Sequence, residues 1–287
     1  MTFRTCGRRL ALLGLLLTAP AVVYSQTLDW VIGPNTLPIG SNLAEIVLPE
    51  GFLYLDNHGT ERLMELTENP LTGQEQATLA PAADDAHWFI VFEWDPMGYV
   101  EDSEGSYLDA DDILAQLRQG NAEGNKERLK RGWATMSIVG WHEPPHYDAT
   151  TRNLTWSVIT ESEGHQGINR IVKLLGRRGV MTATLVSSLE GLETAAIETD
   201  SLLTGYSFNS GSRYAEFVAG SDRMAEIGLT ALIAGGAGAA LVKTGLLARL
   251  WKFLVIGVVA VVAALKRFGE RIFGGGHGGL QGGSQAG

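Results

Sequence analysis

Cysteine is almost missing from this chain. Cys6 is the only one among 287 residues, and it lies close to the amino terminus, ahead of an apolar run typical of an export signal. The exported part of the chain therefore holds no thiol, which excludes disulfides, a cysteine nucleophile and thiolate metal sites. A domain of about 200 residues can do without disulfides, because it buries a sufficient core.

Basic residues are also scarce. Between residues 26 and 225 the sequence has 13 Lys+Arg and 30 Asp+Glu, a difference of −17 (13 − 30), and only three of the basic residues are lysines. A surface with this excess of negative charge repels nucleic acid and anionic lipid. We therefore expect no nucleic-acid partner. The simplest role of the charge is to keep the domain soluble.

The first 25 residues have the three parts of a secretory signal. Three arginines come first, followed by an apolar run from Leu10 to Ala19 and then by small residues. Cleavage after Ser25 and cleavage after Ala21 both fit this pattern. The apolar run is shorter than the about 20 residues that an ordinary transmembrane helix needs. We predict a signal peptide over residues 1–25 and export of the chain that follows.

The composition changes again at Glu226. The uninterrupted apolar run from Phe253 to Leu265 predicts a transmembrane helix, and the Ala- and Gly-rich stretch from Ile227 to Val242 can form the first arm of a helical hairpin. The flanking basic residues favour neither topology. We predict a membrane anchor over 226–268, a disordered Gly-rich tail over 269–287, and a chain held in the inner (cytoplasmic) membrane with its domain in the periplasm.

The intervening residues 26–225 predict a single exported domain of the α+β class with a mainly antiparallel sheet. Trp88–Phe92 is the best candidate for a central strand, because its run of aromatic and β-branched residues is typical of burial on both faces. The other predicted strands are 42–48 and 52–55, joined by a turn at 49–51, a hairpin at 95–100, and 133–139, 153–160, 168–175 and 180–186; the predicted helices are 60–68, capped by Thr60, 109–120, capped by Asp109, 122–130 and 188–203.

The segment Gly140–Asp148, G-W-H-E-P-P-H-Y-D, contains a literal H-E-x-x-H pattern in His142, Glu143 and His146. In zinc peptidases this pattern lies on a helix, so that both histidines reach one metal. Here both intervening residues are prolines, which force an extended backbone. The histidines then have no reason to converge.

Two interpretations of this segment remain. In the first it is a rigid turn after a buried strand, with Trp141 and Tyr147 packed against the core and Asp148 at its exit. In the second, His142, Glu143, His146 and Asp148 carry out acid or base chemistry in a pocket. These four residues are the candidate catalytic residues.

Two charged features could bind a ligand. Glu101, Asp102, Glu104 and Asp109 belong to an acidic segment that could hold calcium, a hard ion that prefers oxygen ligands, although Asp109 is equally typical of a helix N-cap. Calcium is the only cofactor that this pattern suggests. Arg177 and Arg178, at a turn between two glycines, could meet a lipid phosphate or an acidic partner, or form a solvated hairpin tip.

The order of several motifs resembles a known family. They are W-F-I-V-F-E-W-D-P-M-G-Y-V-E-D from Trp88, L-D-A-D-D-I-L from Leu108, G-N-K-E-R from Gly124, G-W-H-E-P-P-H-Y-D, L-G-R-R-G-V from Leu175 and G-S-R-Y-A-E-F from Gly211. Together they resemble an uncharacterised bacterial family of predicted membrane-anchored proteins, domain of unknown function 2167, over most of Leu28–Lys252. The resemblance implies a signal peptide, an exported domain and a C-terminal anchor. It implies no activity.

Three hypotheses for the function follow. The first is a non-catalytic envelope protein whose domain binds another envelope protein or a second copy of itself, with the inner membrane as its other partner. The second is a metal-assisted or acid/base hydrolase centred on Trp141–Asp148. The third, in which the glycine-rich hairpin oligomerises in the membrane, has the least support. Aromatic, glycine and proline residues dominate the motifs and build turns and cores more often than active sites, which favours the first.

Overall fold

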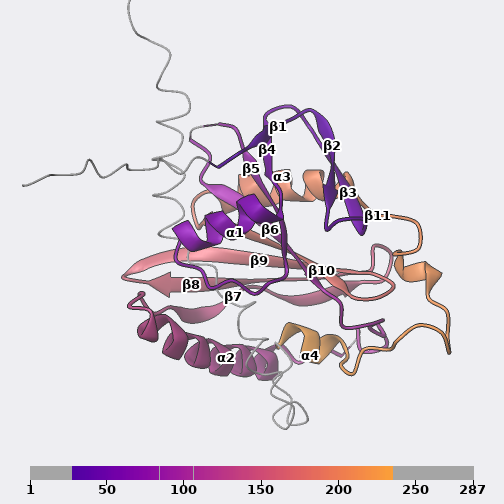
Figure 1. The fold of residues 1–287 in the computed structure, drawn as a ribbon. Helices are drawn as coiled ribbons and strands as arrows, with labels where there is room; N and C mark the ends of the chain where they lie inside the picture. Colours follow the sequence, from indigo (N-terminus) through magenta and orange to yellow (C-terminus); the bar gives the residue numbers. More distant parts are fainter. Residues whose placement is uncertain (1–27, 84, 106, 235–287) are drawn as a thin grey trace, which may run out of the picture.

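The computed structural model describes residues 28–83, 85–105 and 107–234. Its centre is a large antiparallel sheet with helices on both faces (Figure 1), which confirms the prediction of an α+β domain with a mainly antiparallel sheet. The predicted signal peptide, the tail and all of the predicted anchor beyond residue 234 lie outside the described residues. Within those residues, no helix combines the length and the apolar character that crossing a membrane requires.

The large sheet has eight strands in the spatial order β1-β4-β5-β6-β10-β9-β8-β7, and a smaller sheet has the order β11-β3-β2. The strands are β1 (Val31–Ile32), β2 (Asn35–Ile39), β3 (Ala44–Leu48), β4 (Phe52–Leu55), β5 (Glu75–Pro81), β6 (Trp88–Asp95), β7 (Ser137–Asp148), β8 (Asn153–Ser162), β9 (His165–Leu175), β10 (Val180–Ser188) and β11 (Tyr206–Phe208). Strands β7 to β10 form the antiparallel meander that the sequence predicts.

Strand β6 is the central strand, as predicted, and its side chains enter two different apolar clusters. Ile90 and Phe92 pack in the core under the smaller sheet and helix α3 (Leu192–Thr204). Phe89 and Val91 point to the opposite face and pack with α1 (Asn57–Leu66). Burial on both faces explains why the strand is apolar without alternation.

The remaining helices cover the end of the sheet formed by β7, β8 and β9. Helix α2 (Ala110–Lys130) and helix α4 (Leu229–Ile233) pack in a third apolar cluster with these strands, and a short 3-10 turn, η1 (Tyr214–Glu216), precedes α4. Helix α4 belongs to the stretch that the sequence assigns to the anchor, and its Leu229, Leu232 and Ile233 are buried in the domain. Helix α3 starts four residues later than predicted and leaves Leu189 exposed.

Several local predictions are wrong. Helix α1 is capped by Asp56, whose side chain accepts a 2.8 Å hydrogen bond from the Gly59 amide, whereas Thr60 is buried and accepts a hydrogen bond from Thr78 of β5. The predicted strands at 42–48 and 52–55 and the turn between them are present as β3 and β4, although the two strands belong to different sheets. Instead of closing a hairpin, Tyr99 forms a parallel bridge with Met224, far away in the sequence.

The largest difference between the predicted and the observed structure is the length of helix α2. Asp109 caps it as predicted, accepting hydrogen bonds from the Asp111 and Asp112 amides at 3.1 and 3.0 Å. The helix then continues through Gly120 for 21 residues instead of ending there. Its buried stripe, with a spacing of three or four residues, is Ile113, Leu117, Asn121, Gly124 and Arg128. Because this stripe is partly polar in its second half, hydrophobic periodicity alone does not reveal one long helix.

Candidate functional site

The segment Gly140–Asp148 is the second half of strand β7, so the predicted turn is wrong. It lies at the edge of the large sheet, where it pairs with β8 through three register shifts. Pro144 and Pro145 fit this position, because an edge strand tolerates residues without an amide donor. The prediction that the prolines prevent a helix is correct. The backbone is extended, and the H-E-x-x-H residues do not share a helical face.

Helix α2 covers the first half of β7 and the residues just before it. Asn125 donates to the Met136 carbonyl at 2.6 Å and accepts from the Met136 amide at 2.9 Å, and Asn121 donates to the same carbonyl at 2.7 Å. Further along, Arg118 donates to the carbonyl oxygens of Ile138 and Val139. The side chains of α2 therefore occupy backbone groups that an added strand would need.

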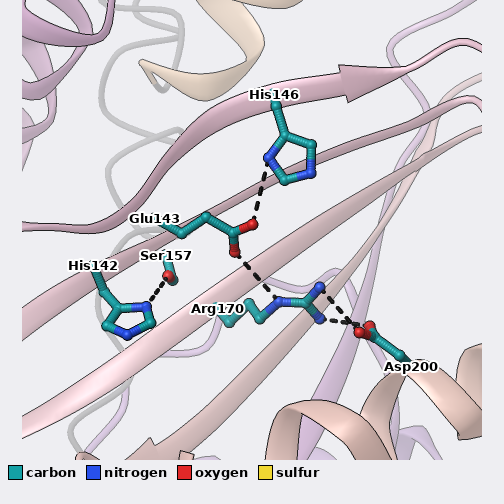
Figure 2. Close-up of polar contacts among 6 residues, drawn as sticks. All are labelled: His142, Glu143, His146, Ser157, Arg170 and Asp200. Atoms are coloured by element: carbon teal, nitrogen blue, oxygen red, sulfur yellow. Dashed lines mark hydrogen bonds and ion pairs between the residues drawn. The ribbon is translucent and has the colours of Figure 1, made fainter. Parts of the chain in front are cut away.

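His142 contacts Ser157 of β8, with 3.0 Å between His142 Nδ1 and Ser157 Oγ (Figure 2). A serine beside a histidine is the pair from which nucleophilic catalysis starts. Ser157, however, is 0% exposed. A side chain without contact to solvent cannot attack a substrate that arrives from solution. This geometry therefore fits a structural hydrogen bond.

Glu143 lies between His146 and Arg170 of β9 (Figure 2). Its carboxylate is 3.5 Å from His146 Nδ1 and 3.7 Å from Arg170 Nε, and Arg170 also contacts Asp200 of α3 at 2.8 Å. We name these five side chains, His142, Glu143, His146, Arg170 and Asp200, the β7 patch. The two histidines of the motif thus have different partners, Ser157 and Glu143, and the Glu143 carboxylate also forms an ion pair with Arg170.

Three residues of this segment, Trp141, Tyr147 and Asp148, have the structural roles predicted for them. Trp141 and Tyr147 pack against the apolar cluster beneath α2. Asp148 accepts a 2.8 Å hydrogen bond from the Thr150 amide and a 3.0 Å bond from the Thr151 hydroxyl. These bonds, the Thr150 amide first, lower the pKa of Asp148, which keeps it an acceptor at the end of the strand.

The acidic segment is divided among different structural tasks. Asp102 accepts a 2.6 Å hydrogen bond from the Tyr147 hydroxyl and pairs with Arg152. Burial acts to raise the pKa of Asp102, but the hydrogen bond and the arginine outweigh it, so this pKa lies below its ordinary value. Glu104 accepts a 2.9 Å hydrogen bond from the Thr230 amide in α4.

The other two candidate metal ligands, Asp109 and Glu101, take no part in the contacts of Asp102 and Glu104. Asp109 caps α2, and Glu101 is exposed. In residues 28–83, 85–105 and 107–234 there is no group of three or more His, Cys, Asp or Glu side chains that could hold a metal ion. Calcium binding by this segment stays a prediction.

A buried row of polar side chains across four strands was not predicted. Glu75 of β5, Glu93 of β6, Thr182 of β10 and Lys173 of β9 are neighbours in register, and all four are buried. Lys173 donates to the Thr182 hydroxyl at 2.8 Å, and the Thr72 hydroxyl lies 2.9 Å from Glu75 and 3.2 Å from Glu93. We name Glu75, Glu93, Thr182 and Lys173 the polar row.

Burial is the largest cause of the pKa shifts of Glu93 and Lys173 in this row. It raises the pKa of Glu93 to about 7, helped by the neighbouring charge of Glu75, and it lowers the pKa of Lys173. The sequence does contain a signal for the row. Lys173 interrupts an apolar strand, and Glu93 directly follows the predicted central strand. A charged residue in a doubly buried strand requires a buried partner, but the sequence does not say which one.

Comparison with known proteins gives one family match and one partial similarity to a solved structure. No curated protein matches the chain. Among solved structures, the solution structure of cyanobacterial PsbP (CyanoP) from Synechocystis sp. PCC 6803 is similar, with 7% identity and a TM-score of 0.37 over 65% of this chain and 96% of that chain. The family model described as a protein of unknown function (DUF2167) matches residues 32–266. This match covers most of the sequence, so the chain belongs to the DUF2167 family.

Proposed function

We propose that the protein is a membrane-anchored protein of the cell envelope whose periplasmic domain binds another protein and catalyses no reaction. The predicted signal peptide and the predicted anchor support the location. The family match supports it further, because it extends to residue 266 and so includes the apolar run from Phe253 to Leu265. The partner is a second envelope protein or another copy of this chain.

The observation that carries the non-catalytic role is the separation of the motif residues into unrelated pairs. His142 contacts a serine that is fully buried, and Glu143 contacts His146 and Arg170. A hydrolase needs a nucleophile or an activated water that the substrate can reach, together with a base beside it. The β7 patch offers neither arrangement within the described residues.

The same side chains are well suited to hold a partner. The side chain of His146 is 54% exposed and that of Asp200 is 58% exposed. Arg170 holds the carboxylates of Asp200 and Glu143 in place through ion pairs. Because α2 and the two prolines close the backbone edge of β7, a partner has to bind through side chains. The domain carries an excess of acidic residues, so a partner surface with exposed lysine or arginine complements it.

The experiment is photo-crosslinking in intact cells. A photoreactive amino acid is placed at His146 in the full chain and, as a matched control, at the exposed Glu163 in the β8–β9 turn. We expect a discrete crosslinked product from position 146 and none from position 163, with the partner identified by mass spectrometry after purification in mild detergent. Equal products from both positions, or none from either, would overturn the proposed binding surface.

The alternative function is a metal-assisted or acid/base hydrolase centred on Trp141–Asp148. The 3.0 Å contact between His142 and Ser157 is the observation in its favour. A fluorophosphonate probe reacts covalently with activated serines, and we expect it to leave Ser157 unlabelled in the folded chain because that side chain is buried. Labelling of the natural chain that disappears in Ser157→Ala would establish the hydrolase instead.

A further inference from the structure

Most basic side chains of this acidic domain have an acidic partner. These pairs are Arg62–Glu65, Lys126–Glu123, Lys130–Glu127, Arg131–Glu127, Arg152–Asp102, Arg170–Asp200 and Arg177–Asp222. Arg178, Arg213 and Arg223 differ, because they are exposed and have no ion pair within the part of the chain that the structure describes. Arg118 is also exposed without an ion pair, but it lies on α2, where it donates to the edge of β7. The guanidinium groups of Arg213 and Arg223 donate to the carbonyl oxygens of Phe208 and Pro96, contacts that involve no carboxylate.

The three arginines come together at one end of the sheet, although they lie far apart in the sequence. Arg178 is in the β9–β10 turn, where its carbonyl oxygen accepts a 3.0 Å hydrogen bond from Gly98. Arg213 bridges to Gly176 in the same turn, and the Arg223 carbonyl accepts a 2.8 Å bond from the Tyr99 amide. The segment between β11 and α4 runs along this end of the sheet (Figure 1).

Two exposed apolar side chains accompany these arginines. Val218 and Met224, in the segment between η1 and α4, are 49% and 40% exposed. Asp222 holds this segment in place, because it accepts a 2.7 Å bond from the Val218 amide and pairs with Arg177 at 2.7 Å. Arg177 is therefore occupied within the fold, unlike its neighbour Arg178. Exposed apolar groups among unpaired arginines are typical of surfaces that meet lipid headgroups.

Acidic groups at this end are held by the fold. Glu216 accepts hydrogen bonds from the amides of Gly211 and Arg213, Asp222 is engaged as described, and Asp95 is largely buried at the end of β6. Glu226 is exposed and follows the apolar pair. These acids reduce the positive charge of the end. Glu216 and Asp222 are occupied by hydrogen bonds within the fold, whereas Arg178, Arg213 and Arg223 are exposed.

We infer that this end, formed by Arg178, Arg213, Arg223, Val218 and Met224 and named here the arginine end, rests on the phospholipid headgroups of the membrane that anchors the chain. The inference rests on the proposed membrane location. Soon after Met224 the chain enters α4, and the predicted anchor continues from there. The arginine end thus lies on the segment that leads into α4, next to residue 226, where the predicted anchor begins. Basic residues near an anionic membrane surface bind it, whereas the acidic remainder of the domain is repelled.

The test measures how close the arginine end comes to lipid. The full chain with Cys6→Ser receives a single labelling cysteine, Val218→Cys or, as a control, Glu163→Cys in the turn at the opposite end of β9. Each variant carries an environment-sensitive fluorophore and is reconstituted in vesicles of phosphatidylcholine with phosphatidylglycerol. Quenching by headgroup-labelled lipid is then recorded.

We expect strong quenching at position 218 and none at position 163. Quenching at 218 should weaken in vesicles of phosphatidylcholine alone, in high salt, and after Arg178→Gln, a change that removes no hydrogen bond identified in the fold. Equal quenching at both positions, or no quenching at 218 in a chain that floats with the vesicles, overturns the inference. A chain that does not float with vesicles at all contradicts the proposed membrane anchoring instead, so the two failures are distinct.

Discussion

The hydroxyl of Tyr147 donates a 2.6 Å hydrogen bond to the carboxylate of Asp102, which lies 45 residues earlier in the sequence. This bond joins the edge strand β7 to the loop before α2. The same carboxylate pairs with Arg152, whose guanidinium lies 5.4 Å from the centre of the Tyr214 ring. The acidic segment and the segment Gly140–Asp148, which the sequence suggested as separate candidate sites, therefore form one structural cluster.

Tyr147→Phe removes the hydrogen bond and leaves the ring in place. We expect a loss of about 1–3 kcal/mol in the free energy of unfolding, since Asp102 is ionised and loses a charge-assisted partner. Urea unfolding of the natural chain and the variant measures the difference. Tyr107→Phe is the control, because Tyr107 is 85% exposed, and it should leave the unfolding curve unchanged. Equal effects of both substitutions would contradict the structural role of Tyr147.

A second prediction concerns the cover of strand β7. Asn125→Ala removes two hydrogen bonds to the backbone of Met136, so the Met136 amide loses this partner while the carbonyl keeps its bond from Asn121. We expect a destabilisation of about 2 kcal/mol and a greater tendency to aggregate. Both are measured by urea unfolding and light scattering at increasing concentration. Glu123→Ala, on the exposed side of the same helix, should change neither quantity.

The polar row predicts a dependence of stability on pH. The pKa of Glu93 is about 7 in the folded chain and 4.5 in the unfolded chain, so between these values the folded state holds a proton that the unfolded state has lost. The stabilisation from this proton is complete below the unfolded value and is lost as the pH rises through about 7. The lowered pKa of Lys173 acts in the opposite sense, increasing stability as the pH rises toward 10.5.

Unfolding in urea at pH about 5 and about 8 measures this dependence. We expect the free energy of unfolding of the natural chain to fall by a few kcal/mol from the lower pH to the higher. A tenfold change in the acid strength of a group on folding changes this free energy by about 1.4 kcal/mol. Glu93→Gln should remove most of this difference, because glutamine does not titrate. Glu50→Gln, at an exposed position, should retain it. A pH dependence that persists in Glu93→Gln would show that other groups cause it.

Calcium addition tests the remaining prediction for the acidic segment. Asp102, Glu104 and Asp109 each have a partner in the fold, so we expect millimolar calcium to leave the melting temperature of the full chain unchanged. Differential scanning fluorimetry in detergent, with magnesium as the matched ion, measures this. A rise with calcium alone, lost in Glu101→Gln, would identify a site that forms only when the ion binds.

The parts of the fold that were predicted are those that depend on neighbouring residues. The cap at Asp109, the buried strand at Trp88 and the meander from β7 to β10 follow from local chemistry and short connections. The continuation of α2 past Gly120 was missed because polar residues of its second half bind the backbone just before β7, and that contact is not visible in a helical pattern.

The candidate site was predicted only in part. Extended backbone at Pro144 and Pro145 follows from steric rules, but the same rules allow a turn or an edge strand. The partners of His142 and Arg170 come from β8 and α3. Such contacts depend on the register of the strands and on how a distant helix packs, so the sequence identified residues of interest without showing how they combine.

The way in which this domain ends its sheets bears on the proposed membrane anchoring, which would bring copies of the chain together in one plane. Confinement to a plane raises the frequency of side-by-side encounters, and each unpaired strand edge is then a place where two copies can fuse. The large sheet ends on one side in β1, only two residues long, and on the other in β7, whose first half is bound by Arg118 of α2 and whose second half contains two prolines. In the smaller sheet, β2 carries Pro38 and β11 has three residues. These edges would let anchored copies lie side by side while each copy keeps its own sheet.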